Sequence, residues 1–119
     1  MVQAGNEILS EVFEGSPNVV YVCGSRKFNS VIKDTVLRET LKGNLVMFPS
    51  LLYLDDDAQH EEIMKTHEEV LHRVESSKIC VADEILVVAP NGYVGECTQK
   101  KIDLAKEIGL EVRLLEGPS

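Results

Sequence analysis

The sequence predicts one α/β domain built in three layers, a parallel sheet with helices on both faces, and three observations lead to this class. Short β-branched apolar runs alternate with amphipathic stretches, in the order strand, helix, strand, helix, strand, helix, strand. The runs are continuous, which is typical of strands buried on both faces. The length of 119 residues fits a single domain. Such alternation implies right-handed crossovers and therefore parallel strands.

The first half of the chain holds two expected strands with a helix between them. Residues 18–23 and residues 45–48 are the strands, since both runs are apolar and end at glycine or proline. Asn29 or Ser30 can cap the helix, because both side chains offer an oxygen to the first helical N–H groups. Its apolar residues recur at helical spacing. Gly43 is suited to the left-handed turn that ends a helix.

The second half is expected to begin with a long helix, from about Ala58 to about Ile79. Asp56 stands three places before Gln59, which resembles a capping box at the start of this helix. A strongly apolar strand, a loop with two glycines, a helix and a last strand follow. Their expected ranges are 84–89 for the strand, 97–108 for the helix and 110–115 for the last strand.

The composition excludes several classes of protein. The net charge of −8 disfavours nucleic acid as a partner, because a phosphate backbone requires clustered Lys and Arg. No apolar run approaches the roughly 18 residues of a membrane span, so no membrane association is expected. Residues 1–16 carry three glutamates and no basic start, which does not fit a signal peptide. We therefore expect a cytoplasmic protein.

The cysteine and glycine patterns exclude several kinds of metal and cofactor site. Cys23, Cys80 and Cys97 form no CxxC pair, so we expect neither a disulfide framework nor a metal site. Cys23 and Cys80 are expected to be small buried apolar residues. The sequence contains neither the GxGxxG fingerprint of dinucleotide binding nor a P-loop. We therefore expect no cofactor.

The topology predicts where a ligand would bind. In an open parallel sheet, ligands bind beyond the carboxyl ends of the strands, at the point where the strand order reverses. With the first strand central, its neighbours are the second and the third. The reversal then falls between the loops Gly24–Phe28 and Pro90–Glu96, both of which contain glycine and polar side chains.

The first of these loops offers a small polar group of residues. Gly24 lets a ligand approach the backbone, Ser25 supplies a hydroxyl, and Arg26 supplies a cationic fork suited to a phosphate or a carboxylate. The alternative is a plain strand-to-helix turn, and the local sequence leaves both open.

The second loop leads into the start of a helix, where N–H groups form an anion site. Gly92, Tyr93, Gly95 and Thr98 are the candidate binding residues, with Tyr93 placed to cover a base or a sugar. Glu96 brings a carboxylate to the same edge of the sheet; alternatively, it only favours the positive end of the helix dipole.

The segments Val20–Arg26, Ala82–Val88, Gly92–Thr98 and Ile102–Ala105 together resemble the nucleoside 2-deoxyribosyltransferase superfamily. The likeness is to its short members, which include the deoxynucleoside 5'-monophosphate N-glycosidases, and covers about residues 18–115. It implies a Rossmann-like or flavodoxin-like fold. It also implies cleavage of a base from a deoxyribose, or transfer of the sugar, in a homo-oligomer in which a neighbouring copy completes the site.

The resemblance assigns roles to particular positions. The family's nucleophile is a glutamate, and its position here is Lys101, which cannot form the glycosyl ester. Glu96 is the nearest carboxylate and the candidate nucleophile. The supporting acid falls at Glu75, which could instead pair with Lys78 one turn on. Asp83 is expected to cap the turn into the third strand.

The leading hypothesis is therefore a protein that binds a nucleoside or nucleotide and cleaves or transfers its N-glycosidic bond. The alternative is a non-catalytic nucleotide-sensing module, which Lys101 favours. A third class is a thiol enzyme that uses Cys97, because a thiol at a helix start can be an activated nucleophile. The simpler expectation is that Cys97 occupies a position that would suit serine.

Overall fold

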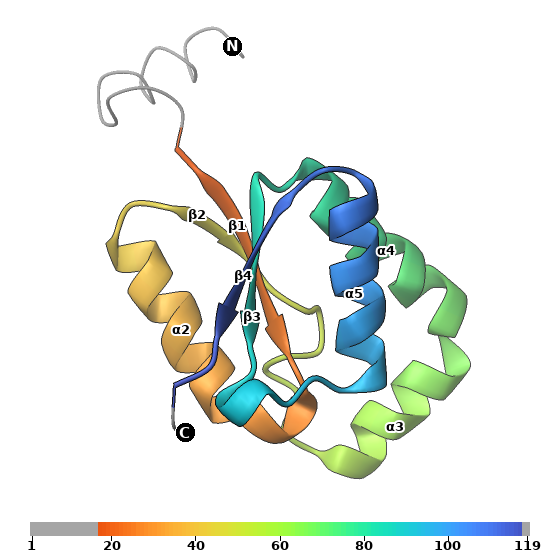
Figure 1. The fold of residues 1–119 in the computed structure, drawn as a ribbon. Coiled ribbons are helices and arrows are strands. Elements are labelled where there is room, and N and C mark those ends of the chain that lie inside the picture. The colour runs from red at the N-terminus through yellow and green to blue at the C-terminus, as the bar shows by residue number, and fades with distance from the viewer. Residues whose placement is uncertain (1–16, 118–119) are drawn as a thin grey trace, which may run out of the picture.

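The computed structural model describes residues 17–117, so the expectation about a signal peptide in residues 1–16 lies outside the described residues. Within them, four parallel strands form one sheet in the order β2-β1-β3-β4. Helix α2 covers one face, and α4 and α5 cover the other (Figure 1). This arrangement confirms the predicted three-layer α/β class. In chain order the elements are β1 (Val19–Gly24), the short turn η1 (Arg26–Phe28), α2 (Asn29–Leu41), β2 (Leu45–Met47), α3 (Asp57–Thr66), α4 (Glu68–Val81), β3 (Glu84–Val88), the short turn η2 (Pro90–Gly92), α5 (Glu96–Glu107) and β4 (Glu111–Leu115).

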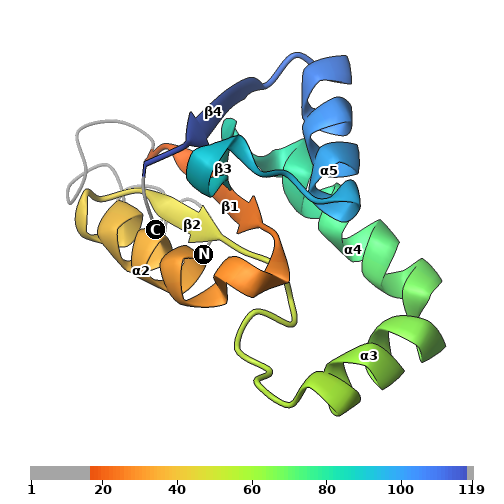
Figure 2. The same cartoon turned by 60° about the horizontal axis from the view of Figure 1, so that its bottom comes forward.

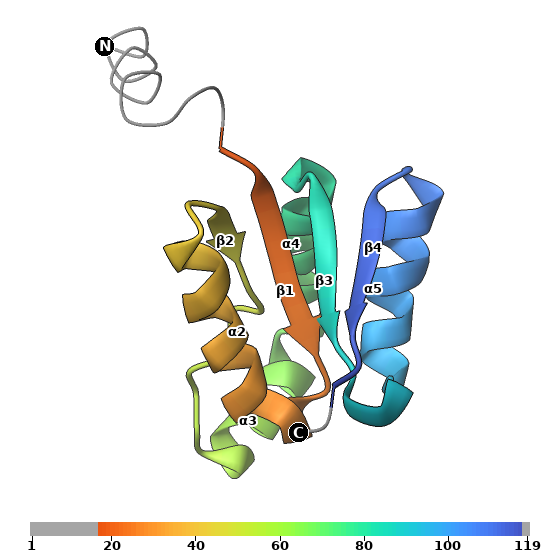
Figure 3. The ribbon, with the colours of Figure 1, turned by 60° about the vertical axis from the view of Figure 1, so that its left-hand side comes forward.

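The four strands and the helix α5 lie within one residue of their expected bounds. Figure 3 shows the strands side by side with α2 in front of them and α4 and α5 behind. Strand β1 is central, because it pairs with β2 on one side and with β3 on the other. In the part of the chain that the structure describes, no helix has the length and apolar character needed to cross a membrane.

The expected long helix of residues 58–79 is wrong, because the structure has two helices there. The chain leaves helical geometry at His67, whose φ is −119° and ψ 28°. Thr66 and His67 are weak helix formers, and acidic Glu68 and Glu69 favour a new helix start. A continuous helix of this length would extend about 33 Å, roughly twice the length of a five-residue strand. Helix α4 therefore covers the sheet, and α3 turns away from it beyond the strand ends (Figure 2).

The expected cap of α3 is confirmed. A carboxylate oxygen of Asp56 accepts a hydrogen bond of 2.9 Å from the backbone N–H of Gln59. The cap satisfies one of the N–H groups that a helix start leaves without a helical partner, and so it fixes where α3 begins.

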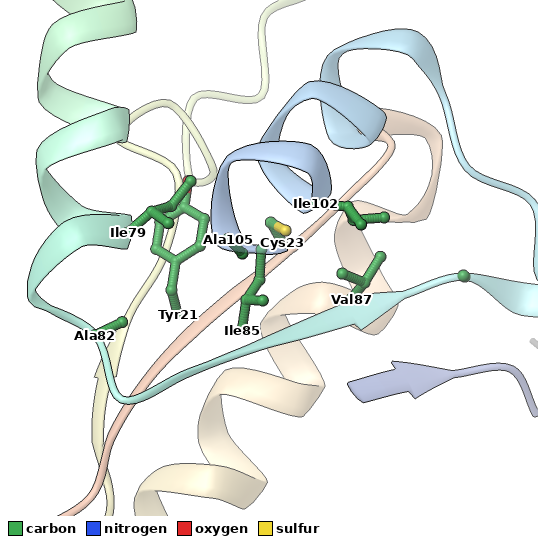
Figure 4. Packing of buried hydrophobic residues seen from close by; sticks show 9 residues of the cluster. Tyr21, Cys23, Ile79, Ala82, Ile85, Val87, Ile102 and Ala105 are labelled. Atoms are coloured by element: carbon green, nitrogen blue, oxygen red, sulfur yellow. The ribbon is translucent and has the colours of Figure 1, made fainter. Parts of the chain in front are cut away.

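Apolar side chains of β1 and β3 fill both faces of the sheet. Cys23 is completely buried in the cluster between the sheet and the helices α4 and α5, as expected (Figure 4). Cys80 was expected to be buried and is exposed, because on α4 it is the neighbouring Ile79 that points into this cluster. The buried members of this cluster are Tyr21, Cys23, Ile79, Ala82, Ile85, Val87, Ala89, Ile102 and Ala105. On the other face the buried members are Val20, Val22, Ile32, Val36, Leu52, Leu86 and Val88.

An ion cluster fastens α2 near the amino ends of the strands. Glu39, near the end of α2, is buried and accepts hydrogen bonds from Lys42 at 2.7 Å, Asn44 at 3.1 Å and Arg113 at 3.4 Å. Arg113, on β4, also pairs with Glu84 on β3. Burial by itself would raise the pKa of Glu39, but Lys42 and Arg113 outweigh it and hold the pKa below its ordinary value. The carboxyl ends of the strands are left for other contacts.

Asp83 was expected to cap the turn into β3, but its side chain bonds to β1 instead. A carboxylate oxygen of Asp83 accepts a hydrogen bond of 2.8 Å from the backbone N–H of Val19, and the N–H of Asp83 donates to the carbonyl of Val19 at 2.8 Å. Asp83 thus ties the turn between α4 and β3 to the start of β1.

Candidate functional site

A cavity of about 320 Å³ opens at the carboxyl ends of the strands, within the size range of small-molecule sites. Its walls come from the loop after β1, the start of α2, the loop after β2, helix α3 and the first turns of α5. It therefore lies at the point where the strand order reverses, as the topology predicts. The lining residues are Gly24, Ser25, Arg26, Asn29, Ile32, Pro49, Leu51, Leu52, His60, Met64, Gly95, Glu96, Cys97, Thr98 and Lys101.

The structure brings the two predicted loops together. Gly24, at the end of β1, pairs in register with Val88 at the end of β3. A Cβ placed on Gly95 would lie 3.9 Å from the Cβ of Ser25. Six of the nine candidate residues line the cavity. They are Gly24, Ser25, Arg26, Gly95, Glu96 and Thr98.

Tyr93 and Gly92 do not line the cavity. The turn η2 carries Tyr93 against the loop after β1, where its ring lies edge-on to Phe28 at 5.8 Å between ring centroids. The ammonium of Lys27 lies 3.4 Å from the centroid of the Tyr93 ring. Gly92 adopts a φ of +79°, and a Cβ there would lie 4.0 Å from a carboxylate oxygen of Glu116. Tyr93 is therefore held in packing contacts. Gly92 supplies the positive φ that the turn requires.

The start of α5 presents backbone donors to the cavity. Gly95 is the residue before the first helical position, and the first helical hydrogen bond runs from the N–H of Gln99 to the carbonyl of Gly95 at 2.9 Å. The N–H groups of the three residues between them therefore precede the helical ladder. Thr98 is buried, whereas Glu96 and Cys97 are exposed at the cavity. This arrangement of N–H groups and helix dipole favours an anion.

Arg26 connects the loop after β1 to the start of α3. Its Nη2 donates to Asp57 at 2.8 Å and to the carbonyl of Leu54 at 3.0 Å, and its Nε donates to the same oxygen of Asp57 at 3.2 Å. The Asp57 side chain is 91% exposed, so this ion pair is strongly screened by water. Arg26 also lines the cavity.

Lys101 occupies the position where the resemblance implies a glutamate nucleophile, and it lines the cavity. Its ammonium lies 5.4 Å from the centroid of the Tyr21 ring, so it points over β1. Its charge favours the thiolate of Cys23, but burial is the larger effect and raises the pKa of Cys23 to about 12. Cys23 is therefore inert, and Lys101 places a positive charge above the carboxyl end of the central strand.

Glu75 lies outside the cavity lining, in a polar cluster behind Tyr21. Its carboxylate accepts hydrogen bonds from the Tyr21 hydroxyl at 2.6 Å, the Ser50 hydroxyl at 2.7 Å, and both the Ser50 N–H and Lys78 at 3.2 Å. Burial would raise the pKa of Glu75, but the bonds from Tyr21 and Ser50 outweigh it and hold the pKa below its ordinary value. The contact with Lys78 is present, but the Glu75 side chain is only 14% exposed, so this is no ordinary surface pair. A carboxyl group in this state is ionised at neutral pH and has no proton to give.

Sequence reasoning missed the contribution of α3. His60 and Met64 stand four positions apart on this helix, and both line the cavity. Their i,i+4 spacing places both side chains on one face of a helix. This signal went unused, because both residues fall within the one long helix that the sequence predicts along the sheet. The loop after β2 adds Pro49, Leu51 and Leu52, an apolar wall.

The comparisons with known proteins add no relative, since no family model and no curated protein matches this chain. Over residues 17–117, no group of three or more His, Cys, Asp or Glu side chains gathers closely enough to hold a metal ion.

Proposed function

We propose that this chain binds a nucleoside or nucleotide in the cavity at the carboxyl ends of the strands. The observation that carries the proposal is the convergence of Arg26, Lys101 and the start of α5 on one cavity in a chain of net charge −8. Arg26 is paired with Asp57, and Glu96 lines the same cavity. The Lys101 ammonium and the N–H groups at the start of α5 nevertheless favour an anionic group such as a phosphate.

The rest of the lining suits the other parts of such a ligand. Ile32, Leu52 and Met64 provide apolar surface for a base or a sugar, while Ser25 and Asn29 provide hydrogen-bonding side chains. The resemblance to the deoxyribosyltransferase superfamily supports the same ligand class. The expected homo-oligomer, in which a neighbouring copy completes the open site, belongs to this proposal.

Lys101→Gln is expected to weaken the binding of a deoxynucleoside 5'-monophosphate roughly 10- to 100-fold. A charge-assisted hydrogen bond contributes about 1.5–3 kcal/mol, which corresponds to that range. Thermal unfolding at increasing ligand concentration measures the affinity, because a ligand that binds only the folded state raises the melting temperature.

Lys100→Gln is the matched control, since Lys100 is the exposed neighbour that does not line the cavity. It removes the same charge from the same helix. Equal losses of affinity in the two variants would show that only the overall charge matters, and the absence of stabilisation by any nucleoside or nucleotide would overturn the proposal.

A second candidate function is cleavage of the N-glycosidic bond, and it is favoured by the position of Glu96 at the cavity. In this reaction the Glu96 carboxylate would attack the anomeric carbon, the bond to the base would break, and the base would leave with a proton taken from solvent. Water would then hydrolyse the glycosyl ester and restore the carboxylate. The ionised state of Glu75 argues against it as the acid for the leaving base.

Glu96→Gln is expected to abolish any release of free base from deoxynucleotides, because an amide cannot form the glycosyl ester. Chromatography of the products after incubation measures the release. Unchanged release would remove Glu96 from the mechanism. No release from the wild-type chain, together with ligand-dependent stabilisation, would leave binding without catalysis.

A further inference from the structure

Helix α3 reaches the cavity through one face only. None of its residues is buried, and it is held at its start by the contacts of Arg26 with Asp57 and with the carbonyl of Leu54. His60 lies one turn into the helix and is half-buried, in contrast to its exposed neighbour Gln59. The two residues of α3 that line the cavity are His60 and Met64.

The imidazole of His60 lies among charged groups of both signs. Arg26 of the loop after β1 and Asp57 of α3 act on it directly, while Lys101, Glu96 and the Cys97 thiol, all on α5, line the same cavity. Burial and then Arg26 lower the pKa of His60, and Asp57 opposes them. His60 is therefore mainly neutral at pH 7 when no anion lies beside it.

An anion in the cavity reverses this balance, because a negative charge near the imidazole favours its protonated form. Uptake of a proton would convert His60 from a neutral wall residue to a third cation beside Arg26 and Lys101. The ligand would then be contacted by α3 as well as by the loops after β1 and β3.

From this geometry we infer that His60 is a further ligand-contacting residue, which binds the anionic group of the ligand as an imidazolium. The inference deepens the proposed function and rests on it, since it concerns the same cavity. Binding is then coupled to proton uptake. The pKa of His60 is higher with the anion bound than without it. The affinity for the anion is therefore lowest at a pH above both pKa values, and it rises as the pH falls from the higher value to the lower one.

Sulfate is the probe of choice, because it keeps its two charges where a phosphate monoester titrates, near pH 6. Isothermal titration of the full chain between about pH 8 and about pH 5.5 brackets the range in which histidine titrates. The wild-type affinity for sulfate is expected to increase about tenfold, as for a shift of one pKa unit. His60→Gln should show a flat profile and retain the weaker affinity of the wild type at high pH.

His72→Gln is the matched control, because His72 is an exposed histidine on α4 that does not line the cavity. It should keep the wild-type profile, and His60→Asn repeats the test should His60→Gln unfold. The inference is overturned if sulfate does not bind, if the wild-type profile is flat, or if His60→Gln keeps the wild-type slope. Nucleotide binding measured in parallel at pH 8 decides the proposed function separately.

Discussion

Replacing Glu75 by alanine is expected to lower the free energy of unfolding by about 2–4 kcal/mol. The Tyr21 hydroxyl is fully buried and would lose its acceptor, and a buried polar group left without a partner costs about 1–3 kcal/mol. Ser50 and Lys78 would lose their contacts with the same carboxylate. Chemical denaturation followed by circular dichroism measures the change.

Glu62→Ala is the control for this prediction, because Glu62 is exposed on α3 and its loss should change stability by less than about 0.5 kcal/mol. A similarly small effect of Glu75→Ala would contradict the structural role of Glu75. It would reopen the role as an acid that the family resemblance implies.

Gly24→Ala is expected to destabilise the fold by about 1–3 kcal/mol and to weaken ligand binding at the same time. An added Cβ would lie 2.7 Å from the carbonyl oxygen of Val88 and 3.2 Å from the Cδ1 of Ile32. The oxygen belongs to the backbone of the paired strand, so β1 and β3 must separate, and overpacking of this kind costs the stated amount. Because the cavity lies at the ends of these two strands, its walls would shift with them.

Gly95→Ser tests whether this effect is specific to Gly24, since both glycines line the cavity. A Cβ on Gly95 meets only ordinary contacts with Ser25, and serine is a preferred residue before a helix start. The variant should be as stable as the wild type or more stable. Equal unfolding midpoints for Gly24→Ala and the wild type, measured by urea denaturation, would contradict the close approach of the two strands.

The sheet and the place of the cavity were predictable from sequence, because local features determine both. Continuous β-branched runs define buried strands, and glycine after the central strand marks the loop that meets the start of α5. Gly24 and Gly95 were found in this way. The backbone geometry of these two glycines depends on residues near them in the chain and on the parallel pairing of β1 with β3.

The parts that escaped prediction depend on contacts between distant segments. No proline or glycine marks the break at His67, so the apolar pattern ran through it. The position of α3 depends on Arg26 and Asp57, which are 31 positions apart. Tyr93, between two glycines, fits a ligand-covering residue by sequence, but Phe28 and Lys27 hold it in packing contacts.

One part of the anion-favouring site is made of main chain, and this has a consequence for how such a site tolerates substitution. The N–H groups at the start of α5 and the bare backbone of Gly24 persist whatever side chains stand at positions 96, 97 and 101. Substitutions at positions 96, 97 and 101 can therefore change the side-chain charge at the cavity while these backbone groups stay in place.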